Sequence, residues 1–119
     1  MPIIIYMLVT GPRPNPPSNI SVRQDNDGLH IAWVAPKYSP VTIQDYVIEY
    51  KTVGQWVPVR APQPADQDTE YTWKTVSRGA TYNFRLLSRS STGALSEPTR
   101  AVTLTTTGMS NCLSFVVYL

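Results

Sequence analysis

SRGATYNFRLLSRSSTG, residues 77–93, is the stretch that decides the fold. Three of its apolar residues, Tyr82, Phe84 and Leu86, occupy every second position. The other set of positions holds polar residues, among them Asn83, Arg85 and Arg89. Successive side chains of a β-strand point to opposite faces of the sheet, so this alternation predicts a strand with one buried and one wet face. Turn-forming residues around Gly79 and Gly93 predict a chain reversal at each end.

The composition fits one small all-β domain. A chain of 119 residues is long enough for a single hydrophobic core and no more. It contains 11 prolines, and no window of ten residues carries apolar side chains at helical spacing. The net charge of +2 is spread along the chain, which argues against binding to nucleic acid. A single cysteine, Cys112, excludes an internal disulfide and a cysteine-based metal site, but it does not decide the compartment.

A hairpin precedes the central strand. Ile20 and Val22 alternate with polar residues, and the sequence DNDG at 25–28 then favours a tight turn, because Asn, Asp and Gly tolerate positive φ. The second arm places three apolar residues on one face, and these are Leu29, Ile31 and Trp33. Prolines after this arm exclude a central strand over residues 37–41.

The remaining strands complete two sheets. Residues 43–52 point Tyr46, Ile48 and Tyr50 inward. Residues 56–59 are predicted as a short edge strand because they contain a proline, and residues 61–68 as a polar crossing between sheets. Strands are also expected over 69–75, through Tyr71 and Trp73, and over 100–106. Seven short strands separated by turns predict an antiparallel β-sandwich.

The two ends of the chain differ from the middle. Residues 1–16 combine an apolar tail with a proline-rich linker, residues 17–107 form the expected domain, and residues 108–119 are a second apolar tail. Neither tail has the roughly 20 apolar residues of a membrane helix, and the first lacks the basic start of a signal peptide. Residues 115–118 are rich in β-forming residues, so association through the second tail is a hypothesis.

Linked motifs in this sequence resemble the fibronectin type III domain. They are Pro17, Leu29-x-Ile31-x-Trp33 with Pro36, Ile43-x-x-Tyr46-x-Ile48-x-Tyr50, Trp56, and Val76-x-x-Gly79-x-x-Tyr82-x-Phe84-Arg85-Leu86 followed by Gly93, Ser96 and Pro98. The resemblance implies an immunoglobulin-like, seven-stranded sandwich with strands A, B and E facing C, C′, F and G. It also implies a tyrosine corner, in which the Tyr82 hydroxyl bonds back to the chain near Val76. The expected core is Trp33, Tyr46, Ile48, Tyr82, Phe84 and Leu86.

Four residues depart from the family pattern, and they are Arg78, Ala80, Ser88 and Ser90. The family usually has proline, threonine, alanine and asparagine at these places. The departures weaken the corner and leave the end of the central strand open, but they do not change the expected fold.

The sequence offers little chemistry. His30 is the single histidine, alternates outward from Ile31 and has no nucleophile beside it, so a solvated strand residue is expected. The acidic turn at 25–28 lacks the glutamate of a helical calcium loop, and Asp66, Asp68 and Glu70 are expected in solvated positions. We therefore predict no enzyme activity and no catalytic, cofactor or metal site.

One strand face and one triplet are the candidate functional features. The outward residues of two neighbouring strands form a candidate partner face: Val47, Glu49, Lys51, Arg85, Leu87 and Arg89. A solvated face with cross-strand pairs and a glycosaminoglycan patch are the alternatives. The triplet Asn19-Ile20-Ser21 is an acceptor for N-glycosylation if the chain is secreted. The loop over 90–97 lacks the Arg-Gly-Asp motif that some family members carry there.

The family resemblance implies a non-catalytic module of a larger chain. We expect an extracellular interaction or spacer domain of a membrane-anchored adhesion or receptor protein, in contact with other proteins or neighbouring domains and not with nucleic acid. An accessory domain of a secreted enzyme and a repeat of a muscle-type intracellular protein remain alternatives. Fold alone does not choose among them.

Overall fold

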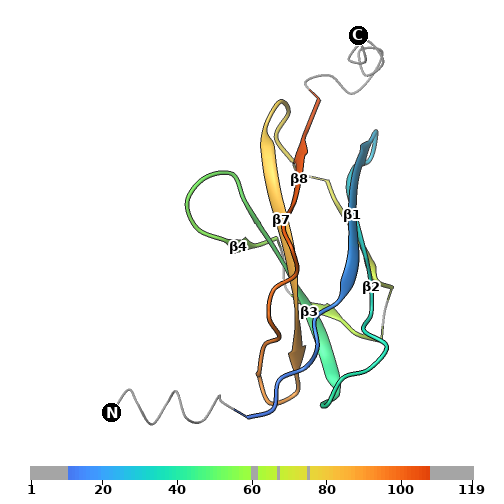
Figure 1. Cartoon of the computed structure of the whole chain (residues 1–119). Helices are drawn as coiled ribbons and strands as arrows, with labels where there is room; N and C mark the ends of the chain where they lie inside the picture. The colour runs from blue at the N-terminus through green and yellow to red at the C-terminus, as the bar shows by residue number, and fades with distance from the viewer. Residues whose placement is uncertain (1–10, 60–61, 67, 75, 108–119) are drawn as a thin grey trace.

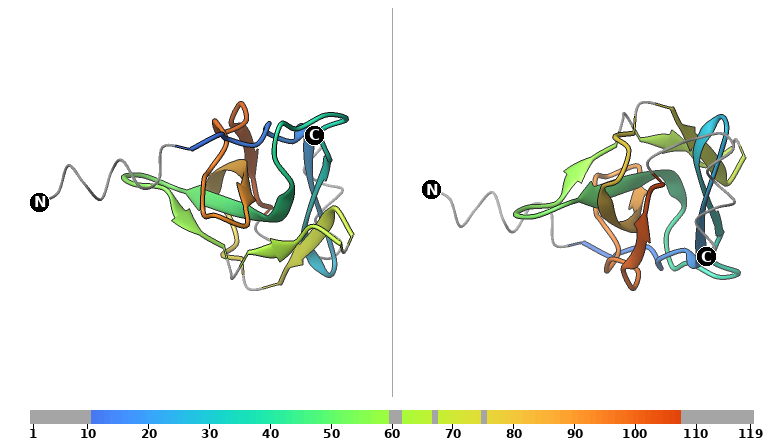
Figure 2. Two further views of the ribbon diagram at one scale, coloured as in Figure 1. Left: turned by 90° about the horizontal axis from the view of Figure 1, so that it is seen from below. Right: turned by 90° about the horizontal axis from the view of Figure 1, so that it is seen from above.

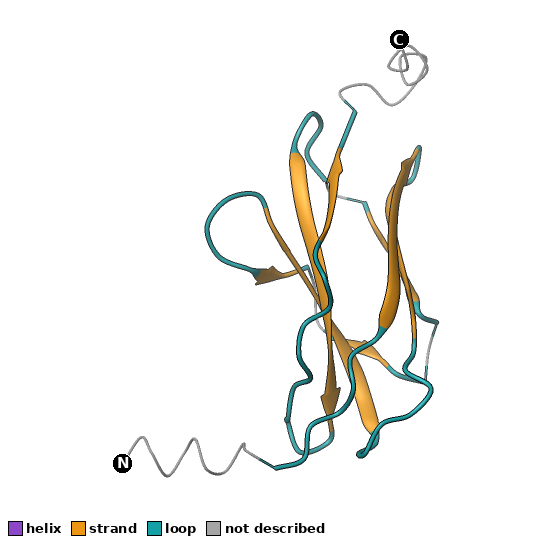
Figure 3. Cartoon of the chain, viewed as in Figure 1, coloured by secondary structure: helices purple, strands orange, loops and turns teal. Residues whose placement is uncertain are grey.

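The computed structural model describes residues 11–59, 62–66, 68–74 and 76–107. Within these ranges the chain forms strands and loops, with two antiparallel sheets packed face to face (Figures 1 and 3). The sandwich expected from the strand pattern is confirmed. The described residues contain no helix long and apolar enough to cross a membrane. The expectations for the two apolar tails, including association through residues 115–118, fall outside the described ranges.

The smaller sheet has the order β1-β2-β6. Its strands are β1 (Ser18–Asp25), β2 (Gly28–Val34) and β6 (Glu70–Trp73). The acidic turn joins β1 to β2, with Asp25 paired to Gly28 across the hairpin. The amide of Asp27 donates a 2.8 Å hydrogen bond to Asp25 Oδ1, which is the local side-chain contact that favours aspartate in tight turns.

The larger sheet has the order β4-β3-β7-β8, and β5 pairs with the same edge of β3 as β4 does. Its strands are β3 (Ile43–Lys51), β4 (Val57–Pro58), β5 (Gln63–Pro64), β7 (Thr81–Ser90) and β8 (Val102–Thr105). Figure 2 looks along the strands and shows β1 and β2 facing β3 and β7 across the interior. The long antiparallel pair of β3 and β7 is therefore the centre of the larger sheet.

The segment expected as a crossing between sheets contains β5, which corrects that expectation. Gln63 pairs with Tyr46 and is 7% exposed, and its Nε2 donates a 3.0 Å hydrogen bond to the carbonyl of Asp68. A strand of two residues has no alternation to read, and Pro64 discouraged its assignment. The side-chain bond to Asp68 gives the buried amide of Gln63 a partner and ties β5 to the loop that follows it.

The core lies between the two sheets. The six expected core residues are all buried, and three more join them in the same cluster: Leu29, Ile31 and Trp73. Trp33 meets Tyr46 edge to face, with 5.6 Å between ring centroids, and Trp73 contacts Tyr82 in the same way at 5.2 Å. Such pairs add about 0.5–1.5 kcal/mol to the burial of each ring. Aromatic contacts between the sheets and buried aliphatic side chains therefore build the core together.

The start of β7 is fixed by a tyrosine corner. The amide of Ser77 donates a 2.9 Å hydrogen bond to the Tyr82 hydroxyl, one residue beyond the place expected from the resemblance. Thr106 supports the same corner, since its hydroxyl donates to the carbonyl of Ser77 at 2.8 Å and accepts from the amide of Ala80 at 2.9 Å. The departures from the family pattern at Arg78 and Ala80 therefore leave the corner intact.

Replacing Tyr82 with phenylalanine removes the acceptor of the Ser77 amide and keeps the ring. We expect the free energy of unfolding to fall by about 1–3 kcal/mol, the cost of leaving a part-buried donor unpaired. Urea unfolding measures this change. The matched control is Tyr38→Phe, because Tyr38 is 71% exposed and should lose nothing. Equal stability of the two variants would contradict the role of the corner.

The far end of β7 continues to Ser90, through the two serines that depart from the family pattern. Both serines are buried, and the amide of Ser88 donates a 2.9 Å hydrogen bond to Ser96 Oγ. The amide of Ser90 bonds the carbonyl of Ala94 at 2.9 Å, so the following loop folds tightly back on the strand. These bonds explain why the strand does not end earlier.

Residues 11–17, which we call the strap, cross the end of the sandwich before β1. Arg13 donates hydrogen bonds to the carbonyl of Leu95 at 2.7 Å and to Glu97 Oε2 at 3.0 Å. Asn15 Nδ2 donates to the carbonyl of Tyr38 at 2.8 Å, and two of the four prolines of the strap, Pro14 and Pro17, are buried. The proline-rich segment thus contacts two loops of the domain. A domain boundary at residue 17 stays a prediction.

Candidate interaction surfaces

The outer face of β3 and β7 brings the candidate partner residues into register. Val47 lies opposite Leu87, and Glu49 opposite Arg85. Arg85 Nε donates a 2.7 Å hydrogen bond to Glu49 Oε1. The face is thus a set of directly opposed side chains from the two central strands, which is the geometry in which cross-strand pairs interact.

Arg89 pairs with an acid that sequence reasoning had not selected. Its Nε and Nη2 donate to the two carboxylate oxygens of Asp45, at 2.9 and 2.8 Å, in a bidentate pair. The hydrogen bond and the charge of Asp45 raise the pKa of the Arg89 guanidinium above its usual value. Asp45 lies two residues before Val47 on β3, so the alternation of the strand alone places both residues on the same face.

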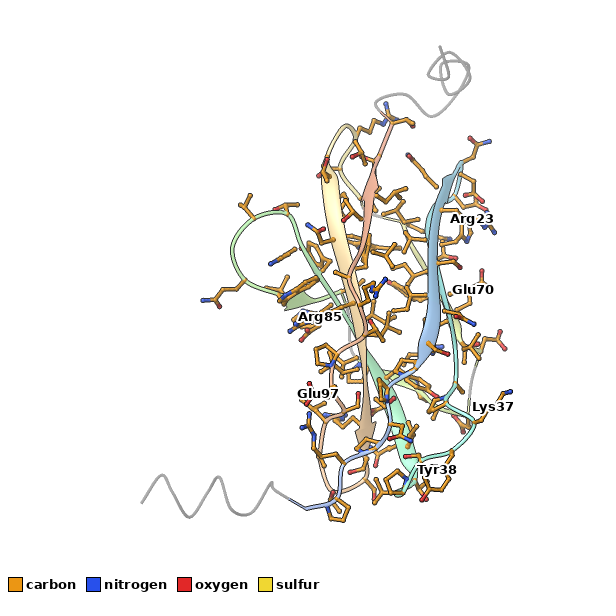
Figure 4. All side chains as sticks on the ribbon, in the orientation of Figure 1. Arg23, Lys37, Tyr38, Glu70, Arg85 and Glu97 are labelled. Atoms are coloured by element: carbon orange, nitrogen blue, oxygen red, sulfur yellow. The ribbon has the colours of Figure 1, made fainter. Side chains whose placement is uncertain are left out.

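A tryptophan immediately before β4 completes this face. The Trp56 ring is half-buried, with Lys51 Nζ 4.8 Å and the Arg85 guanidinium 4.4 Å from its centroid. Cations at these distances interact with the electron-rich face of the ring. Figure 4 shows Arg85 on the side from which the β3–β4 loop projects. The strand pattern had placed Trp56 on an edge strand but gave no reason to join it to Arg85.

The electrostatics of this face weigh against an anion-binding patch. Two of its three cations, Arg85 and Arg89, already bond carboxylates, and Arg85 and Glu49 are only 27% and 20% exposed. Leu87 is 7% exposed, so it is a covered part of the face and not a free contact point. We name the set Asp45, Val47, Glu49, Lys51, Trp56, Arg85, Leu87 and Arg89 the paired face.

His30 is not the solvated residue that its outward position predicted. Its side chain is 12% exposed, with Nε2 2.7 Å from Asp25 Oδ2 and Nδ1 3.0 Å from Thr72 Oγ1. The hydrogen bond from His30, followed by that from the Asp27 amide, lowers the pKa of the Asp25 carboxyl below its usual value. Neighbours on β6 and on the hairpin turn cover the ring, and alternation within one strand cannot reveal such neighbours. Figure 4 shows Glu70 on the outer side of this sheet.

The contacts of Asp25 also bear on whether the cluster of Asp25, Asp27 and His30 could hold a metal ion. One ligand atom each from Asp25, Asp27 and His30 lies within 4.8 Å of the others, which is close enough to compare with a metal site. However, Asp25 Oδ1 accepts the Asp27 amide, and Oδ2 is shared by His30 and Arg23, the latter at 3.1 Å. The carboxylate is thus committed to cross-strand contacts that fasten the hairpin. The predicted absence of a metal site stays a prediction.

A groove lies between the start of β1 and the segment that leads into β8. It has a volume of about 460 Å³ and is lined mainly by prolines and aliphatic side chains, with Asn19 among the lining residues. Asn19 itself is exposed and has a φ of 51°. Asp66, Asp68 and Glu70 are exposed as well, at separate places on loops and on β6.

The pattern of sheets, corner and core corresponds to a known family. The model of the fibronectin type III domain matches residues 15–105. The chain belongs to the fibronectin type III family. Domains of this family generally mediate protein contacts, and a single such domain is typically non-catalytic.

The chain is similar to one short part of a long curated protein and to domains of solved structures. Protein turtle of Drosophila melanogaster is 36% identical over 80 residues, which cover 67% of this chain and 5% of that protein. The solved fibronectin type III domain of human fibronectin type III domain containing protein 3 has a TM-score of 0.65 at 24% identity, with 85% of this chain and 93% of that chain covered. The twitchin kinase region of C. elegans has a TM-score of 0.71 at 23% identity, with 84% and 18% covered. At these identities the two solved structures show the fold alone.

Proposed function

We propose that this domain is a non-catalytic interaction module in the extracellular part of a membrane-anchored adhesion or receptor protein, and that its paired face contacts another protein. The observation that carries the proposal is Trp56, whose ring centroid lies 4.8 Å from Lys51 Nζ and 4.4 Å from the Arg85 guanidinium. Tryptophan and arginine are enriched among the residues that dominate the binding energy of protein interfaces. A ring already held by two cations loses little freedom on binding, so its contacts contribute more to affinity.

The remainder of the paired face supports a protein partner over a glycosaminoglycan. A polyanion needs unpaired cations, whereas Arg85 and Arg89 each bond a carboxylate at 2.7–2.9 Å. The opposite charges of the Glu49–Arg85 and Asp45–Arg89 pairs, on either side of the half-buried Val47, instead suit the polar rim of a protein interface. The match to a small part of a long relative supports a module that works within a larger chain.

Two measurements on cells that express the full-length parent protein test this proposal. An antibody against the domain should label intact cells before permeabilisation. Beads coated with the domain should bind the same cells, and Trp56→Ala should reduce that binding about tenfold, as expected for the loss of a central anchor worth about 1.4 kcal/mol or more. The matched control is Lys74→Ala, because Lys74 is exposed and follows β6 of the other sheet.

Each result bears on one part of the proposal. Labelling that requires permeabilisation would overturn the extracellular setting. Equal binding of wild type and Trp56→Ala would overturn the paired face as the contact surface. If binding falls sharply in 0.5 M salt and heparin competes with it, the partner is a polyanion and not a protein. Salt screens contacts between exposed charges more strongly than it weakens a partly apolar protein interface.

A further inference from the structure

We propose that Asn19 carries an N-linked glycan whose first N-acetylglucosamine lies in the groove between β1 and β8. The inference rests on the extracellular setting proposed above, because the transfer takes place in the secretory pathway. Asn19-Ile20-Ser21 is the one Asn-x-Ser/Thr triplet of the sequence whose middle residue is not proline. The structure adds the backbone conformation of Asn19 and the residues that surround it.

The backbone presents Asn19 at an irregularity in β1. Ser18 pairs with Val34 and Ser21 with Ala32, so β1 has one extra residue between these pairs. Such a bulge leaves residues unpaired and redirects a side chain. The φ of Asn19 is 51°, a left-handed conformation that asparagine adopts more readily than most residues. Asn19 is exposed, and so is Ser21, the second required residue of the triplet.

The groove beside Asn19 suits the sugar. Pro17 and Ile20 line it from the β1 side, Pro98 and Val102 from the β8 side, and Arg100 also contributes to its lining. Its volume of about 460 Å³ is within the range of about 300–1,000 Å³ typical of small-molecule sites. N-acetylglucosamine has an apolar C–H face and a methyl group for such walls, and an acetamide carbonyl that accepts hydrogen bonds from a guanidinium.

The covalent step needs one co-reactant, a lipid-pyrophosphate-linked oligosaccharide. The amide nitrogen Nδ2 of Asn19 forms a bond to C1 of the first N-acetylglucosamine. The bond between that C1 and the pyrophosphate oxygen breaks, the amide loses one proton, and the lipid pyrophosphate leaves. No oxidation or reduction is involved.

A glycan at this place would cover the seam of the sandwich. β1 and β8 are the outer strands of their sheets, and each is paired on one side within the described residues. One end of the seam is bridged by the amide of Thr107, which donates a 2.8 Å hydrogen bond to Gln24 Oε1. The groove lies toward the other end. Unpaired strand edges favour association with other chains, and a covering group prevents it.

The test uses the full chain secreted from mammalian cells behind an added signal sequence, so its result does not depend on the natural location of the protein. We expect a mass increase that peptide-N-glycosidase F removes, converting the acceptor asparagine to an aspartate. Ser21→Ala should abolish the increase, and Ser21→Thr should retain it. Ser21→Ala keeps Asn19 and its backbone conformation, and tryptophan fluorescence of each variant verifies folding.

Nuclear magnetic resonance tests separately whether the sugar lies in the groove. In the glycosylated protein we expect nuclear Overhauser effects between the acetamido methyl of the first sugar and the methyl groups of Val102. A mass increase without these contacts would overturn the groove as the site of the sugar. No mass increase in either wild type or Ser21→Thr would overturn the glycan, and surface labelling of the parent protein would then still decide the proposed function separately.

Discussion

Replacing Trp33 with alanine should lower the free energy of unfolding by about 3–5 kcal/mol. Trp33 is 3% exposed and packs its ring against Tyr46 of the opposite sheet. Alanine would leave a cavity between the two sheets, and the surrounding strands are too firmly paired to close it. The stability of a domain of this size is typically 5–15 kcal/mol, so the variant would lose a large fraction of it.

Urea unfolding monitored by circular dichroism measures this loss, with Trp33→Phe as the matched control. Phenylalanine keeps most of the ring volume and removes Nε1, which is buried and has no hydrogen-bond partner among the described residues. We therefore expect a much smaller loss for Trp33→Phe than for Trp33→Ala. A change of less than about 1 kcal/mol in Trp33→Ala would contradict the position of Trp33 in the core.

The second large effect is expected for Gly28→Ala, at the first residue of β2. Gly28 has a φ of 133°, and a Cβ built on it would lie 2.4 Å from the carbonyl oxygen of Trp73 and 3.1 Å from Lys74 Cα. Both contacts are with backbone, so no side chain can move aside. Alanine must push β6 away from β2 or unwind the hairpin turn. We expect a loss of about 2–4 kcal/mol in the free energy of unfolding.

Gly54→Ala separates the clash from the cost of an unfavourable φ. Gly54 has a φ of 84°, and a Cβ added there would meet no atom within 4 Å. Its substitution should therefore cost only about 1–2 kcal/mol of backbone strain. Thermal unfolding of the two variants compares them directly. If Gly28→Ala were as stable as Gly54→Ala, the close approach of β6 to the hairpin would not be a constraint on the sequence.

The sequence predicted the long strands well because alternation is a local signal. Tyr82, Phe84 and Leu86 reveal the buried side of β7 without knowledge of its neighbours, and Tyr46 and Ile48 do the same for β3. β5 was missed because two residues show no period. The burial of His30 was missed because residues distant in the chain cover its ring.

The paired face shows the same division between local and distant information. The outward positions of Glu49 and Arg85 follow from the alternation of side chains along each strand. The two residues lie opposite each other because the two long strands pair in antiparallel. Asp45 lies on the same face of β3 as Glu49, so the alternation of the strand was enough to predict its place. The place of Trp56 could not be predicted in this way, because its contact with Arg85 depends on the path of the β3–β4 loop, which no periodic pattern records.

We expect the strap to affect how the domain responds to a pull between its two ends. Figure 1 shows the first and last described residues at opposite ends of the sandwich, so a pull between them runs along the strands. Such a pull loads the β1–β2 and β7–β8 ladders in shear, where many hydrogen bonds must break together. The bonds of Arg13 and Asn15 to two loops take the load first and can break one at a time. The domain should therefore extend in two steps, with release of the strap before rupture of the sandwich.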